Sequence, residues 1–264
     1  MFTPKANLVS VTFNRLEFTK QTLPNIRETA SDTIPYYLTV VDNGSTDGTV
    51  EYLKELFENR IIDNLILLKE NIGVAKGSNL GWRLFDEVPV YAKIDNDVLF
   101  SRKNWLDDIL HILENAPEIG ALGYNLETKN IYPVTSNGKV SYRFKGGNVG
   151  GACHFIPSHV KEVLGYWNEN FDKYGEEDAD YGMRIMYAGF KNAYMEDENV
   201  LTHLGEPESD YVLFKREQRN KNLQGIFQRF AAGYLNKTIP LYNNSDIENE
   251  CKYQYYSHHR ERLL

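Results

Sequence analysis

Two aspartates two residues apart, Asp95 and Asp97, follow an apolar run that ends at Ile94. Two carboxylates in an extended loop suit a hard cation, Mg²⁺ or Mn²⁺, that also binds a diphosphate through oxygen. Such a cation would neutralise phosphate charge and help a diphosphate depart. The alternative interpretation is a polar turn that caps a helix expected over residues 102–114.

An acidic run from Tyr174 to Asp180 opens a helix expected over residues 176–188. One acid of this run, facing a cleft, could act as a general base. The alternative is charge matching to the helix N-terminus, which stabilises by about 0.3–1 kcal/mol per acid. Asp178 and Asp180 repeat the Asp-x-Asp spacing, but side chains two residues apart on a helix diverge. A shared metal is therefore less plausible there than at Asp95 and Asp97.

Three further features could bind a ligand, and each has a structural alternative. His203 follows a short apolar run, and a neutral imidazole is a good metal ligand beside a carboxylate, although a lone histidine is more often structural. Asp42 could accept hydrogen bonds from a nucleobase or ribose, or act as a turn aspartate before a helix capped by Ser45 or Thr46. The loop 71–79 contains glycines that allow close backbone approach, and Lys76 adds a cation.

The first half of the chain alternates strand and helix patterns that would position these residues. Strands are expected at residues 8–13, 37–41, 65–68 and 88–94, and helices at 15–29, about 46–58 and 75–86. This order predicts right-handed βαβ units, hence an α/β fold with a mostly parallel central sheet flanked by helices. Ligands bind such sheets outside the carboxyl ends of the strands, where Asn14, Asp42 and Asp95 are all expected.

From about residue 120 the pattern becomes shorter and richer in glycine, which predicts a smaller β/α region. Strands are expected at residues 121–124, 139–144, 150–156 and 199–203, and a long amphipathic helix at 211–235. Residues from 236 onward match no clear pattern. We therefore divide the chain into a first half (1–120), a second half of the same domain (121–208), and a C-terminal helix and tail (209–264).

Composition narrows the class of protein. The 264 residues include 29 basic and 37 acidic side chains, a net charge of −8, which argues against a general nucleic-acid binder. Two distant cysteines are no disulfide framework, and no stretch approaches the ~18 apolar residues of a membrane span. No leader pattern is visible at the N-terminus. We expect a cytoplasmic protein without a transmembrane segment. Peripheral contact with the inner face of a membrane stays open because Lys215, Arg216, Arg219 and Lys221 form a basic patch, although such a patch is more often a solvated face.

The order of these motifs resembles that of family 2 glycosyltransferases, which have the GT-A fold. The resemblance covers roughly residues 7–205. It rests on six motifs in order: Val9 to Arg15, Val41 to Thr49, the loop from Asn71 to Gly81, Asp95-Asn96-Asp97, Gly150-Gly151-Ala152 and the pair Glu177-Asp178, with His203 after them.

The resemblance implies that residues 1–120 are the nucleotide-sugar-binding half and residues 121–208 the acceptor-binding and catalytic half. It also implies a role for each matching residue. The nucleotide-sugar pocket would be lined by Thr12, Asn14, Arg15, Asp42, Asn43, Lys76, Asn79, Asp95 and Asn96. Asp97 and His203 would bind the divalent cation (Mn²⁺ or Mg²⁺), and Asp178 would be the catalytic base. Gly150, Gly151 and Glu177 would lie on the acceptor side. Trp167 and Tyr174 are added there because aromatic rings stack on sugar faces, although most aromatic residues serve packing.

The implied activity is metal-dependent, inverting transfer of a sugar from a nucleoside-diphosphate donor, with a UDP-sugar as the first guess. The acceptor hydroxyl would belong to a saccharide, a lipid-linked molecule or a protein. The Gln-x-x-Arg-Trp motif of processive members is absent, since Gln218-Arg219 and Gln228-Arg229 lack that form, so one sugar is expected per encounter. Two other functions stay open: a sugar-phosphate nucleotidyltransferase and a non-catalytic nucleotide-sugar-binding protein.

Overall fold

The computed structural model describes residues 3–85, 87–124, 134–137, 140–150, 152–171, 173–196, 200–205, 213, 217 and 223–259. A ten-stranded sheet runs through it in the order β12-β3-β2-β1-β4-β9-β6-β10-β8-β7. A second sheet pairs β5 (Val98–Phe100) with β11 (Leu201–His203). The structure confirms the predicted α/β architecture.

The four central strands of the first half are parallel, as the βαβ pattern predicts. They are β1 (Ala6–Thr12), β2 (Tyr37–Asp42), β3 (Asn64–Leu68) and β4 (Val90–Ile94). The helices that connect them are α1 (Leu16–Thr29), α2 (Thr49–Glu58) and α3 (Val74–Leu84). All four strands therefore end at the same edge of the sheet.

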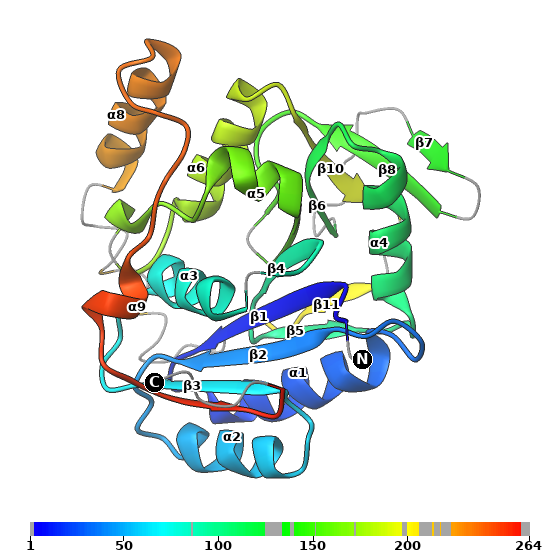
Figure 1. The fold of residues 1–264 in the computed structure, drawn as a ribbon, viewed down its shortest axis with the longest axis vertical. Coiled ribbons are helices and arrows are strands. Elements are labelled where there is room, and N and C mark those ends of the chain that lie inside the picture. The colour runs from blue at the N-terminus through cyan, green and yellow to red at the C-terminus, as the bar shows by residue number, and fades with distance from the viewer. Residues whose placement is uncertain are drawn as a thin grey trace.

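Both faces of this parallel region are buried, which explains why its strands are apolar nearly throughout. Leu8, Val40 and Leu65 pack with α1, α2 and α4 (Trp105–Asn115) on one face. The next residue of each strand, Val9, Val41 or Ile66, packs on the opposite face with α3. Figure 1 shows α1 and α2 on one side of the sheet and α3 on the other.

The second half extends the sheet with antiparallel pairs. Strand β9 (Cys153–Pro157) lies antiparallel between β4 and β6 (Ile119–Tyr124), and β10 (Lys191–Met195) is parallel to β6. Strands β8 (Val140–Lys145) and β7 (Val134–Asn137) complete that edge. Helices α5 (Ser158–Leu164) and α6 (Glu177–Tyr187) join α3 on its face of the sheet. The division at residue 120 stays a prediction, although one continuous sheet joins the two halves.

The C-terminal segment, which the sequence left unassigned, returns to the first half. After α8 (Leu223–Leu235) it forms α9 (Ile247–Glu250) beside α3 and then β12 (Tyr253–Ser257), antiparallel to β3 at the sheet edge (Figure 1). Of the helix expected over 211–235, residues 223–235 are confirmed; the basic residues 215, 216, 219 and 221 lie outside the described residues. Within the described part of the chain, no helix is both long and apolar enough to span a membrane.

Candidate active site

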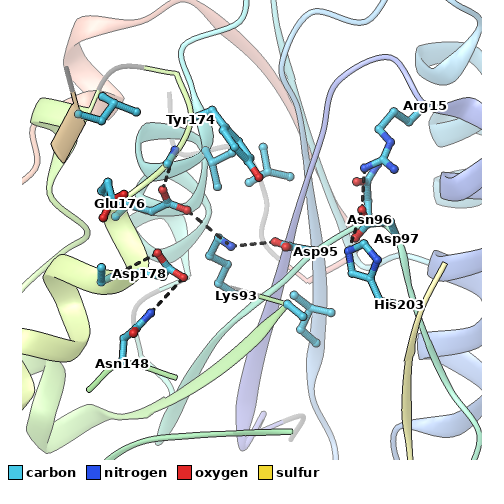
Figure 2. Close-up of a pocket in the computed structure, with 18 of the residues that line it drawn as sticks. Arg15, Lys93, Asp95, Asn96, Asp97, Asn148, Tyr174, Glu176, Asp178 and His203 are labelled. Atoms are coloured by element: carbon cyan, nitrogen blue, oxygen red, sulfur yellow. Dashed lines mark hydrogen bonds and ion pairs between the residues drawn. The ribbon is translucent and has the colours of Figure 1, made fainter. Parts of the chain in front are cut away.

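A cavity of about 780 Å³ opens at the carboxyl end of β4. The Asp95–Asp97 loop, the start of α6 and the end of β11 all contribute to its walls. Figure 2 shows the acids of α6 on one side of the cavity and the Arg15–Asp97–His203 group on the other, with Lys93 and Asp95 between them. The charged and polar lining residues are Arg15, Lys93, Asp95, Asn96, Asp97, Asn148, Tyr174, Glu176, Glu177, Asp178, His203 and Gln224.

Asp97 is the central residue of one side. Its Oδ2 lies 2.7 Å from Arg15 Nη1 and 3.4 Å from His203 Nε2, and the residue is 3% exposed. Its Oδ1 is buried and accepts no hydrogen bond from any residue that the structure describes. A buried carboxylate oxygen without a donor is costly, so this atom is available to a ligand.

Strand pairing brings His203 to Asp97 across more than a hundred residues of chain. Val98 of β5 pairs with His203 of β11, and the Leu204 N–H donates to the Asp97 carbonyl at 2.8 Å. The Gly205 N–H donates to His203 Nδ1 at 3.1 Å, which fixes the ring. The position of His203 is therefore set by the pairing of its strand with β5 and by the Gly205 N–H on its ring.

Lys93 lies between the two sides. It is a cation in an otherwise apolar, buried strand, with Nζ 2.8 Å from Asp95 Oδ1 and 3.9 Å from Glu177 Oε1. Burial lowers the pKa of Lys93, but Asp95 and Glu177 outweigh burial and hold the pKa above its ordinary value. Lys93 is therefore charged throughout the physiological range.

The start of α6 supplies the acids of the other side. Glu177 is 7% exposed and accepts the Gly175 N–H at 3.1 Å. Burial raises the pKa of Glu177 to about 7; Lys93 acts against this shift and Asp178 adds to it. Asp178 is half-buried, accepts its neighbour's N–H at the helix start, and lies 3.3 Å from Asn148 Nδ2. Of the two acids, Asp178 is thus the more accessible.

A buried ion pair anchors α6. Arg184 Nε lies 2.8 Å from Asp180 Oδ2, both side chains are fully buried, and Tyr234 of α8 donates to Asp180 Oδ1 at 2.8 Å. The guanidinium also donates to the carbonyls of Leu164, Tyr166 and Leu241. Asp180 is therefore structural, and Asp178 faces the cavity, as expected for side chains two residues apart on a helix.

A smaller cavity of about 30 Å³ adjoins the first one at the carboxyl end of β1. Thr12, Asn43, Asn71 and Lys173 line it, and it shares Arg15, Asn96 and Tyr174 with the main cavity. Asp42 lies behind it, fully buried. Its oxygens accept hydrogen bonds from the hydroxyls of Thr12 and Ser45 and from the N–H groups of Gly44 and Ser45.

Most of the residues predicted for the site come together. Arg15, Asp95, Asn96, Asp97, Glu177, Asp178 and His203 line the main cavity, and Thr12 and Asn43 line the smaller one. Tyr174 lines both. Gly151 lies outside the described residues.

Two predictions are wrong because the side chains are used inside the fold. Trp167 is fully buried between Trp82, His154 and Tyr181, so its ring presents no face to an acceptor. Asn79 is also fully buried, and its amide pairs with the Trp167 backbone and with Glu169. Both residues hold α3 against the turn before α6.

Four other predicted residues line neither cavity. Lys76 is half-buried on α3. Asn14 accepts the Thr46 N–H, and Asp42 organises its own turn. The Gly150 N–H donates to the Tyr194 hydroxyl at 2.8 Å. The predicted cap of α2 is also wrong: Gly48, with φ +93°, precedes the helix, and Ser45 pairs with Asp42 instead.

The structure adds residues that the sequence reasoning missed. Lys93 is the clearest, and its signal was a lysine inside an apolar strand that leads into Asp95. Asn148 reaches Asp178 because Gly182 lacks a side chain; a Cβ at Gly182 would lie 2.5 Å from Asn148 Cα. The contact between Asn148 and Asp178 could not be predicted from the sequence, because it depends on how α6 packs on the loop that carries Asn148.

Comparisons with known proteins identify the family of the chain. Residues 8–162 match a family model described as Glycosyl transferase family 2. The chain is 24% identical over 148 residues to an uncharacterized glycosyltransferase of Haemophilus influenzae, covering 55% of this chain and 43% of that protein. It is 23% identical over 239 residues to an uncharacterized protein of Acanthamoeba polyphaga mimivirus, covering 80% and 27%. The chain thus spans less than half the length of either relative.

Solved structures share the fold. A mannosyltransferase from Pyrobaculum calidifontis in complex with GDP-Man and Mn²⁺ has a TM-score of 0.61 and 18% identity, covering 81% of this chain and 61% of that one. TarS of S. aureus in complex with UDP has a TM-score of 0.56 and 16% identity, covering 88% and 71%. Both likenesses identify the fold as GT-A.

Proposed function

We propose, from the premise that the chain belongs to glycosyl transferase family 2, that it transfers a sugar from a nucleoside-diphosphate donor to an acceptor hydroxyl. One observation carries the proposal. A single cavity has the half-buried carboxylate of Asp178 on one side and the Asp97–His203 pair on the other. A base and a leaving-group site on opposite walls are the two elements that the reaction requires.

The residues around Asp97 fit a divalent cation. The orphaned Oδ1 of Asp97 offers one oxygen ligand to Mn²⁺ or Mg²⁺. His203 Nε2, which lies 3.4 Å from Asp97 Oδ2, would offer a nitrogen ligand once the ring moves its proton to Nδ1 and gives up the hydrogen bond from the Gly205 N–H. No cluster of three or more metal-ligating side chains occurs among the described residues, so a diphosphate and water would complete the coordination. When bound, such a cation supplies positive charge that stabilises the departing diphosphate.

Asp178 is proposed as the general base. Its carboxylate takes the proton of the acceptor hydroxyl, and that oxygen attacks the anomeric carbon as the diphosphate leaves. Because Asp178 and Asp97 lie on opposite sides of the cavity, the attacking and leaving oxygens occupy opposite faces of the sugar. A single displacement of this kind inverts the anomeric configuration.

The nucleoside is proposed to lie in the main cavity, at the edge that it shares with the smaller one, because the smaller cavity has room for only about one water. Arg15, Asn96 and Tyr174 line both cavities at this edge, and Thr12 and Asn43 line the smaller one beside it. The relatives of the same fold are described with GDP-Man or UDP, which supports a nucleoside-diphosphate sugar donor without choosing the base. A UDP-sugar donor, a saccharide, lipid-linked or protein acceptor, and a cytoplasmic location stay predictions.

A thermal-shift panel tests the donor site first. UDP, GDP, dTDP and CMP would each be added with and without Mn²⁺, since a ligand that binds the native state raises the melting temperature. We expect a metal-dependent rise with one nucleoside diphosphate, which Asp97→Ala abolishes. Transfer is then assayed with the corresponding nucleotide sugars and a panel of acceptors. Binding without turnover would support the non-catalytic alternative, and the absence of any shift would remove the donor site.

A further inference from the structure

The geometry points to Lys93 as a positioning residue that acts through Glu177 to hold the start of α6, and with it Asp178, against the Asp95–Asp97 loop. This inference rests on the proposed role of Asp178 as the base. Lys93 makes one ion pair with the loop after β4, through Asp95 at 2.8 Å, and one with the start of α6, through Glu177 at 3.9 Å. A buried cation between two carboxylates resists their separation more than a solvated one does, because water does not screen its charge.

The link from Lys93 to Asp178 runs through one turn. Glu177 uses one oxygen toward Lys93 and accepts the Gly175 N–H with the other. Glu176 has φ +66°, a left-handed conformation that is costly for a residue with a side chain, so this turn depends on such contacts. Asp178 follows Glu177 directly, and its orientation is therefore set by the same turn.

The protonation state of Glu177 decides whether its ion pair with Lys93 persists. The pKa of Glu177 is about 7, so near neutrality this carboxyl changes between an ion-paired anion and a neutral acid. A neutral Glu177 loses its attraction to Lys93, which releases the turn. Removal of Lys93 would raise the pKa of Glu177 further, because Lys93 is the neighbour that lowers it.

Other titratable groups around this pair come from three elements. Asp95 in the loop after β4 and Asp178 on α6 are both acids near Lys93. On β9, burial lowers the pKa of His154 to about 3 and raises the pKa of Cys153 to about 12, so both are uncharged near neutrality. Glu176 also lines the cavity. Of these groups, Glu177 is the one whose pKa is shifted into the neutral range.

The test compares Lys93→Met, Lys93→Arg, Glu177→Gln and the double variant Lys93→Met/Glu177→Gln. Two quantities are measured: the pH profile of kcat/KM for sugar transfer, and the pKa of the Glu177 carboxyl by NMR, with Glu177→Gln to assign the signal. Lys161→Met is the matched control, since Lys161 lies over the Tyr91 ring at the opposite end of β4. We expect the control to keep the wild-type profile.

In Lys93→Met, we expect the Glu177 pKa to rise by about one pH unit or more. The acid limb of kcat/KM that Glu177 sets should disappear, because residue 93 then offers no cation to the Glu177 carboxylate at any pH. Lys93→Arg should keep both near the wild-type values. When residue 177 is already Gln, the further substitution Lys93→Met should not change the pH profile of kcat/KM. If Lys93→Met lowers only the stability and leaves both quantities unmoved, the inference is overturned.

Two further outcomes are decisive. If Lys93→Met does not fold, a wild-type pH profile in Glu177→Gln overturns the inference, and a lost acid limb supports it. If the wild type transfers no sugar from any donor, the proposed function fails by itself. The NMR measurement then decides the Lys93–Glu177 link independently of turnover.

Discussion

Arg15 Nη1 lies 2.7 Å from Asp97 Oδ2, and the two side chains are only 8% and 4% exposed. The backbone of this segment is strained: Asn14 has φ +47° and Arg15 has φ +143°. Ser45 and Asp47 hold it by accepting the N–H groups of Asn14 and Arg15. The guanidinium thus occupies one oxygen of the carboxylate proposed to bind the metal.

Arg15→Met should therefore tighten Mn²⁺ binding in the absence of nucleotide. Removal of the competing cation leaves Asp97 with both oxygens available, and a tenfold gain corresponds to about 1.4 kcal/mol. We expect at least about tenfold by titration calorimetry or electron paramagnetic resonance. Arg27→Met, which breaks the ion pair of Arg27 with Asp63, is the control. Unchanged Mn²⁺ affinity in Arg15→Met would contradict the competition.

Asp178→Asn should abolish most transfer and spare donor binding. An amide cannot take the acceptor proton, and general-base catalysis contributes about 10²–10⁴-fold. The measurement is kcat for transfer, beside the nucleotide affinity, which we expect to change less than about twofold because Asp178 lies across the cavity from Asp97. Asp246→Asn, an exposed aspartate before α9, is the matched control. Near-normal transfer by Asp178→Asn would exclude it as the base.

The raised pKa of Glu177 predicts that the protein loses stability as the pH rises. Its pKa is raised from 4.5 to about 7 in the folded state, so the folded protein binds this proton more tightly than the unfolded chain. Stability contributed by this group is therefore full below about pH 4.5 and is lost as the pH rises toward 7. The loss is at most about 3 kcal/mol. Urea unfolding at pH 5 and 8 should show a smaller loss in Glu177→Gln than in the wild type; equal losses would contradict the shift.

Gly182→Ala should impair catalysis through Asn148. A Cβ at position 182 would lie 2.5 Å from both Cα and Cβ of Asn148, so the loop carrying Asn148 must move away from Asp178. We expect transfer to fall about tenfold or more, with a stability cost of about 1–3 kcal/mol. Met186→Ala, an exposed position on the same helix, is the control. If kinetics are unchanged while stability falls, Asn148 has no role in transfer.

Arg184→Met should destabilise the fold strongly. It leaves Asp180 as a buried charge without its cation, a change that typically costs about 3–5 kcal/mol. Urea denaturation measures the effect, and Lys20→Met provides a contrast because the Lys20–Glu17 pair is exposed. We expect no measurable change in Lys20→Met. A cost in Arg184→Met as small as that of Lys20→Met would mean that Asp180 is satisfied by Tyr234 and Asn168 alone.

The local sequence pattern was sufficient to predict the parallel half of the fold and to identify the acidic residues of the site. The buried strands and the polar residues at their ends are encoded by hydrophobic periodicity, and parallel strands must end at one edge. Asp95, Asp97 and Asn43 could therefore be placed together from their positions after β2 and β4. The separation of Asp178 from Asp180 also follows from helix geometry alone.

The tertiary structure decided which polar side chains remain available. Asn79 and Trp167 lie beside predicted motifs, but packing of α3 on the turn before α6 uses both inside the core. His203 reaches Asp97 only through the pairing of β11 with β5, and Lys93 meets Glu177 only because α6 packs at the end of β4. The sequence by itself determined the parallel strands, the helices between them and the positions of the acids, because these depend on neighbouring residues. The contacts that select a working site depend on residues more than eighty positions apart, and only folding brings them together.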